Sequence, residues 1–152
     1  MEKLSMGLSG VAGEYYVAAE LSRRGFMASI MLRNNDSVDI LASNLSGKKI
    51  FSVQVKTNQN GKREWILKKK AEEPINSLIY IFVSLKDGLT RPEFFLIPSL
   101  ELSAIIKNDH IKWLSGIAKS GRTRNDSDMR KFRDYAGAYL EKWDILLSEA
   151  YP

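Results

Sequence analysis

Apolar and polar residues alternate along the chain with two different spacings, which together predict both helices and strands. Residues 8–24 place apolar side chains every three or four positions, as on one face of a helix, and Gly25 provides a helix stop. Alternating or uninterrupted apolar stretches indicate strands at residues 27–32, 37–42, 49–57, 64–67, 78–85 and 93–97. Helical spacing is found at residues 67–73, from Ser99 to about residue 107, and at residues 127–148.

These elements predict an α/β fold, with residues 1–152 forming a single nuclease-like domain of ordinary size. We expect a mixed sheet of about five strands flanked by helices. The first helix would cover one face of the sheet, and the C-terminal helices would cover the other. The predicted inner stripe of the last helix consists of Met129, Phe132, Ala136, Tyr139, Trp143 and Leu146.

The composition limits the kinds of site and the cellular location that we expect for this chain. The chain contains no cysteine, which excludes disulfides and thiolate metal sites and is compatible with a reducing compartment. No apolar run approaches the ~20 residues of a membrane-spanning helix. The first five residues lack the basic flank and apolar stretch of a signal peptide. We therefore expect a cytoplasmic protein with no membrane partner, while the oligomeric state, a homodimer included, stays open.

The net charge of +5 is compatible with a polyanionic partner or with an ordinary solvated basic surface. Much of the positive charge lies in a few short segments. From these we select as candidate nucleic-acid contacts Lys68, Lys69, Lys70, Arg122, Arg124 and Arg130.

Glu14 is the first candidate for chemistry. On a helical wheel it lies in the middle of a narrow stripe formed by Gly7, Val11, Ala18 and Leu21, whereas Glu20 falls elsewhere. A glutamate in an apolar stripe is costly unless it is paired or bound to a cation. The alternatives are a structural ion pair or a helix rotated from this prediction.

Three more candidates come from the two strands that follow. Strand alternation separates Asp39 from its apolar neighbours, and it places Gln54 and Lys56 on one face of the next strand. If the two strands form a hairpin, Asp39 lies roughly level with residues 52–54. Asp36, expected in the loop before the first of these strands, is a secondary candidate. The simpler alternative is a polar face of a hairpin that contacts water.

The order of these residues resembles the PD-(D/E)XK nuclease superfamily. The opening Gly10-x-x-Gly13-Glu14, the Gly25-Phe26 pair and Asp39-Ile40 are similar to archaeal Holliday-junction resolvases. The triplet Gln54-Val55-Lys56 is similar to the Gln-x-Lys motif of Mrr-like restriction endonucleases. The resemblance covers residues 8–57, about a third of the chain.

The resemblance implies a role for each residue of the motif. Asp39 would be the central metal ligand, with Glu14 contributing directly or through a metal-bound water. Gln54 takes the place of a second carboxylate, and the backbone carbonyl of Val55 completes the shell. Lys56 would orient or help to deprotonate the attacking water. Mg²⁺ or Mn²⁺ suits an all-oxygen site, and the implied reaction is hydrolysis of phosphodiester bonds in DNA.

The sequence departs from the usual pattern in three respects. Gln54 is neutral, so the site would hold a metal less tightly than one with two motif carboxylates. Val38 stands where a proline is common, and residues 57–77 leave little room for a full crossover helix. Two alternatives stay open: a nuclease-like fold that binds nucleic acid or protein without cutting, and an interaction protein of a toxin or immunity system. The second would use the aromatic-rich C-terminal third as its interface.

Overall fold

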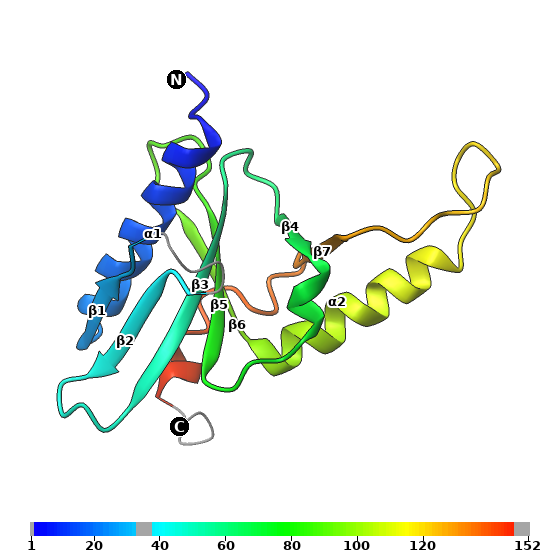
Figure 1. The fold of residues 1–152 in the computed structure, drawn as a ribbon. Helices are drawn as coiled ribbons and strands as arrows, with labels where there is room; N and C mark the ends of the chain where they lie inside the picture. The colour runs from blue at the N-terminus through cyan, green and yellow to red at the C-terminus, as the bar shows by residue number, and fades with distance from the viewer. Residues whose placement is uncertain (1, 33–37, 148–152) are drawn as a thin grey trace.

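The computed structural model describes residues 2–32 and 38–147, and within them five strands form one mixed sheet (Figure 1). The order across the sheet is β1-β2-β3-β5-β6, with β1 at Phe26–Ile30, β2 at Ile40–Asn44, β3 at Ile50–Asn58, β5 at Leu78–Ser84 and β6 at Glu93–Pro98. β3 and β5 run parallel, and the other neighbouring pairs are antiparallel. The predicted α/β fold with a mixed sheet of about five strands is confirmed.

The sheet separates two hydrophobic cores, because successive side chains of a strand point to opposite faces. α1 (Met6–Ser22) packs on one face and α2 (Ser99–Leu114) on the other (Figure 1). The core on the α1 face includes Val17, Leu21, Ile40, Val53, Val55 and Ile81. The core on the α2 face includes Leu78, Phe82, Leu102, Ile106 and Phe132. None of the helices in the described ranges is long and apolar enough to cross a membrane.

The connection between the parallel strands β3 and β5 contains a strand and a 3-10 turn. β4 (Glu64–Lys68) pairs antiparallel with β7 (Met129–Arg133), and together they form a second sheet, which we call the β4–β7 ribbon. η1 (Lys69–Glu72) then leads back towards β5. The helical segment predicted for residues 67–73 is therefore one 3-10 turn that ends before Pro74.

The long helix predicted for residues 127–148 is wrong. β7 occupies its beginning, a loop follows, and the 3-10 helix η2 (Trp143–Leu146) comes next. Gly137 adopts a positive φ of 76°, and the Asp134 carboxylate accepts hydrogen bonds from the backbone N–H groups of Ala138 and Tyr139, both at 2.8 Å. These features favour a turn over a continuous helix. Of the predicted stripe, Phe132 joins the α2-face core, whereas Trp143 and Leu146 join the α1-face core.

α2 extends beyond the sheet. It ends at Leu114 instead of near residue 107, and Figure 1 shows its last turns and the following loop projecting from the rest of the chain. The loop is closed by an isolated bridge between Ile117 and Thr123. We call residues 110–128 the arm.

Candidate active site

The hairpin of β2 and β3 fixes the position of Asp39. The Asp39 backbone N–H donates to the Val53 carbonyl at 2.9 Å. The Val55 backbone N–H donates to Asp39 Oδ2 at 2.7 Å. The N–H and C=O of one strand residue point to the same side of the strand, so the Val55 carbonyl is directed to the side on which the Asp39 carboxylate lies. The local backbone thus brings two oxygen atoms that could bind a metal, one from Asp39 and one from Val55, to the end of β2.

Gln54 and Lys56 lie together on the β3 face opposite Val53 and Val55, as strand alternation predicts. They line a cavity of about 330 Å³, which we call the Gln54 cavity. Gln54 is only 6% exposed, so its amide is held within the fold and not on a solvated hairpin face. The remaining lining residues are Ile66, Leu67, Lys68, Lys70, Ala71 and Tyr80.

Tyr80 is a site residue that the sequence did not reveal. It is the partner of Gln54 in the parallel ladder of β3 and β5, and it is buried. Burial, and then the negative charge of Asp39, raises the pKa of the Tyr80 phenol above its ordinary value of 10.0. Tyr80 therefore stays a neutral hydroxyl near Asp39 at physiological pH. The available signal was the one polar group among the apolar residues 78–83.

Glu14 is carried to this end of β3 by a close approach of α1. A Cβ atom on Gly13 would lie 1.9 Å from Thr57 Oγ1, so only glycine allows the helix to come this near. Gly13 and Thr57 are the chain neighbours of Glu14 and Lys56, respectively. Glu14 itself is half-buried. The helix–strand contact therefore brings the backbone at Glu14 and the backbone at Lys56 to the same part of the fold.

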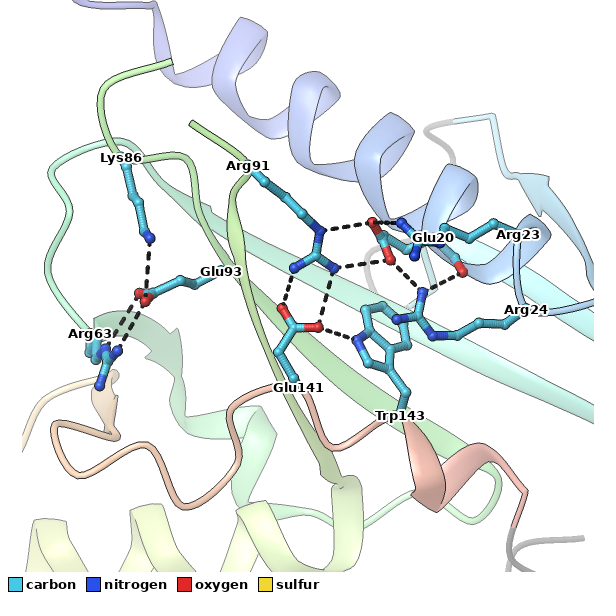
Figure 2. A network of polar contacts seen from close by, with 9 residues as sticks. All are labelled: Glu20, Arg23, Arg24, Arg63, Lys86, Arg91, Glu93, Glu141 and Trp143. Carbon is cyan, nitrogen blue, oxygen red and sulfur yellow. Dashed lines mark hydrogen bonds and ion pairs between the residues drawn. The ribbon is translucent and has the colours of Figure 1, made fainter. Parts of the chain in front are cut away.

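The buried face of α1 is nevertheless rotated from the predicted stripe. Its buried residues are Ser9, Gly13, Val17, Glu20 and Leu21. Glu20, expected elsewhere on the wheel, is only 7% exposed and contacts arginines (Figure 2). Arg24 donates to its carboxylate, and Arg91 approaches it to 3.1 Å. The helix is therefore rotated from its predicted orientation, and Glu20 forms a structural ion pair.

These contacts form part of a larger cluster, which we call the Glu20 network (Figure 2). Arg91 also donates to Glu141 at 2.7 Å, and Glu141 accepts a hydrogen bond from the Trp143 indole at 2.7 Å. The Arg24 guanidinium lies over the Trp143 ring. Burial alone would raise the pKa of Glu20, but hydrogen bonds from Arg91 and Arg24 outweigh it, and the pKa lies below its ordinary value.

The six basic candidates are divided among different environments. Lys68 and Lys70 line the Gln54 cavity, whereas the Lys69 amino group lies 3.6 Å from Asp126. Arg130 is only 3% exposed and is paired with Glu72.

The arm holds the other two candidates. Arg124 donates to the Trp113 carbonyl at 2.7 Å, and its guanidinium lies 5.0 Å from the centre of the Trp113 ring. Arg122 is exposed in the arm. The structure thus brings only two of the six basic candidates to the cavity. Asp36 lies outside the described residues.

The donor set suits a hard cation. Asp39 and Glu14 would supply carboxylate oxygens, Gln54 an amide oxygen and Val55 a carbonyl oxygen, which are the ligand types of Mg²⁺ and Mn²⁺. In the described ranges, no three histidine, cysteine, aspartate or glutamate side chains are grouped to hold a metal. A site here would therefore depend on the neutral oxygens as well as on the carboxylates.

Comparison with solved structures identifies the fold. A bacterial homing endonuclease, I-Ssp6803I, superposes with a TM-score of 0.57 at 13% sequence identity, covering 97% of this chain and 96% of that chain. Hjc, a Holliday junction resolvase from the archaeal hyperthermophile Archaeoglobus fulgidus, gives a TM-score of 0.49 at 15% identity, covering 90% and 99% of the two chains. No family model and no curated protein matches this sequence. The predicted likeness to nucleases is confirmed as a likeness of fold to this homing endonuclease.

Proposed function

We propose that this protein is an Mg²⁺- or Mn²⁺-dependent endonuclease that hydrolyses phosphodiester bonds in DNA. The observation that carries the proposal is the Val55 N–H to Asp39 carboxylate hydrogen bond of 2.7 Å, which holds Asp39 beside Gln54 and Lys56 of β3. The nuclease-like fold supports it independently. The proposed site combines the Asp39 carboxylate with the Gln54 amide oxygen and the Lys56 amino group, and the last two residues lie two positions apart on β3.

Asp39, Gln54, the Val55 carbonyl and Glu14 are the proposed metal ligands. When bound, the cation would lower the pKa of a coordinated water and offset the charge that develops on the phosphate. The hydrogen bond from Val55 keeps the Asp39 carboxylate in one orientation, which limits the reorganisation needed when a cation binds. Burial of Gln54 serves the same purpose for its amide.

Lys56 is the proposed partner of the attacking water. It shares a strand face with Gln54, so its amino group can orient that water or accept its proton, according to its protonation state. Lys68 and Lys70 add positive charge at the rim of the cavity and are the proposed contacts of the scissile phosphate. The neutral Tyr80 hydroxyl can donate a hydrogen bond into the same cavity.

The remaining basic candidates contribute differently to DNA binding. Arg122 is the proposed phosphate contact of the arm. Lys69, Arg124 and Arg130 are assigned a positioning role. Lys69 joins η1 to Asp126 of the arm, Arg124 contacts Trp113 within the arm, and Arg130 joins β7 to Glu72 of η1.

Cleavage assays with matched variants test the proposal. Linear, branched and single-stranded DNA would be incubated with each metal and with EDTA. Asp39→Asn retains an oxygen that can accept the Val55 N–H but removes the charge. We expect it to lower the cleavage rate at least about a thousand-fold, as loss of a preorganised electrostatic contact does. Lys56→Ala should have a comparable effect, whereas Asp144→Asn, an exposed carboxylate on η2, should not.

Unchanged cleavage in both Asp39→Asn and Lys56→Ala would overturn the assignment of the site. Circular dichroism melting of each variant separates lost chemistry from lost structure.

One observation favours a second candidate function, a nuclease-like domain that binds DNA without cutting it. Gln54 replaces a carboxylate, and the described part of the chain holds no group of three acidic or histidine side chains placed for a metal. Under this alternative, the wild-type protein would retain DNA in gel-shift assays while showing no cleavage with either metal.

A further inference from the structure

The β4–β7 ribbon has two unlike faces. Trp65, Leu67 and Phe132 point inward and are almost fully buried in the α2-face core. The outer face is formed by the alternate residues Glu64, Ile66 and Lys68 of β4, and Met129, Lys131 and Arg133 of β7. Two apolar side chains of this face are exposed, Ile66 at 62% and Met129 at 50%. These two side chains do not pack in a hydrophobic core, so core packing does not explain why they are apolar.

The outer face lies between two hollows of the surface. Ile66 and Lys68 line the Gln54 cavity together with Gln54 and Lys56. Across the ribbon, the three outer residues of β7 line a second pocket of about 210 Å³, whose other wall contains His110 and Trp113 of α2. A molecule that follows the ribbon would therefore extend from the candidate active site to the base of the arm.

The charge of this face suits a polyanion. Lys68, Lys131 and Arg133 carry positive charge, against the single carboxylate of Glu64. That carboxylate accepts a hydrogen bond from the Tyr135 hydroxyl at 2.8 Å and lies 3.9 Å from Arg133 Nε. The face is thus a cationic surface with two apolar side chains among its charges, which is the composition expected for contacts with both phosphates and base edges.

We infer that the β4–β7 ribbon enters the major groove of duplex DNA and contacts base edges beside the scissile phosphate. This inference rests on the proposed function and names duplex DNA as the substrate. Two strands lie about 4.8 Å apart. The major groove, at about 12 Å wide, admits a two-stranded ribbon, whereas the undistorted minor groove, at about 6 Å, is too narrow. Lys131 and Arg133 would donate to guanine N7 and O6 or to phosphates, and Ile66 and Met129 would contact thymine methyl groups.

Methylation protection in EDTA tests the inference without requiring cleavage. Dimethyl sulfate modifies guanine N7 in the major groove and adenine N3 in the minor groove. The wild-type protein should protect guanine N7 on a duplex and leave adenine N3 accessible at the same positions. In Lys131→Ala/Arg133→Ala, that protection should disappear and duplex affinity should fall about 10- to 100-fold. Lys48→Ala/Lys142→Ala removes the same charge at exposed positions outside the ribbon and should retain both.

Three results would overturn the inference: unchanged guanine N7 protection in the ribbon variant, protection confined to adenine N3, or tighter binding to single-stranded DNA than to duplex. The outcome is separable from the nuclease assignment. Guanine N7 protection without cleavage by either metal would remove the proposed activity and keep the ribbon as a DNA reader. Cleavage without guanine N7 protection would keep the proposed activity and remove the ribbon as a DNA reader.

Discussion

The two faces of the sheet carry polar clusters of different construction. On the α1 face, the Glu20 network encloses its carboxylates with arginines, and Arg91 reaches both Glu20 and Glu141. On the α2 face, the Gln54 cavity brings an amide, a phenol and amino groups around an open volume. Charges that are matched within the fold can hold distant segments together. Polar groups that line a cavity can contact a ligand. We therefore expect stability to depend on the Glu20 network and activity on the residues of the Gln54 cavity.

The largest expected effect comes from neutralising one carboxylate in the Glu20 network and one in the candidate site, and comparing the losses of stability. Glu20→Gln should lower the free energy of unfolding by about 3 kcal/mol, because the guanidinium groups of Arg23, Arg24 and Arg91 lose a buried counter-charge. Asp39→Asn should change it by less than about 1 kcal/mol, because Val55 keeps a hydrogen-bond acceptor. Urea unfolding measures both, with the exposed Glu2→Gln as the control. Equal losses in the two variants would remove the distinction.

Acid titration provides an internal check on the Glu20 result. The folded pKa of Glu20 lies below its ordinary value of 4.5, so the carboxylate stabilises the folded state above that pH. This contribution is lost as the pH falls through the folded pKa. The stability difference between wild type and Glu20→Gln should therefore be constant above about pH 5 and shrink in more acidic solution. A difference that grows on acidification would contradict the ion-pair explanation.

The contact of α1 with β3 is a second, smaller test, because it connects helix packing to the candidate site. Gly13→Ala would place a Cβ atom 1.9 Å from Thr57 Oγ1, so α1 must shift, at a cost of about 2 kcal/mol. Cleavage should fall as well, because Glu14 moves with the helix. Thr57→Ala should restore part of both losses in the double variant.

Gly10→Ala is the matched control for this variant. An added Cβ there meets nothing within 4 Å, and alanine favours the helix by about 0.5–1 kcal/mol. If Gly13→Ala behaved like Gly10→Ala, close packing at Thr57 would not position Glu14.

The smallest expected effect concerns Gln54. Gln54→Glu adds one anionic oxygen with little change in volume, and calorimetry should show Mn²⁺ binding about ten-fold tighter. Asn60→Asp adds the same charge on an exposed turn, where its side-chain oxygen accepts the Lys62 N–H at 2.9 Å. It should not affect metal affinity. Absence of metal binding in both wild type and Gln54→Glu would favour the non-cutting alternative.

The sequence was sufficient to predict those parts of the site that depend on local geometry. Strand alternation alone puts Gln54 and Lys56 on one face, and the short β2–β3 hairpin brings Asp39 level with them. The five main strands were predictable for the same reason, because each is a continuous or alternating apolar run. The metal-binding and catalytic roles of these residues stay predictions.

Features that depend on distant segments were not predictable. The apolar spacing of residues 127–148 fits a helix, but β4 provides a strand partner, and Asp134 and Gly137 interrupt the segment. The burial of Glu20 depends on Arg91, which is 71 positions away. Tyr80 acquires its position only when β5 pairs in parallel with β3. Local spacing alone does not give these long-range pairings.

The β4–β7 ribbon also has a consequence for the order of folding. Its ladder joins Lys68 to Met129 and Glu64 to Arg133, whereas the β2–β3 hairpin joins residues close in sequence. Closing a long loop costs more entropy than closing a short one, so we expect the hairpin with Asp39 and Gln54 to form before the ribbon. Trp65 lies on β4 within 5.1 Å of Phe82, measured between ring centres. In a variant in which Trp113 and Trp143 are replaced, its fluorescence would report the later step. A newly synthesised chain would then assemble the hairpin with Asp39 and Gln54 first and the proposed DNA-contacting ribbon last.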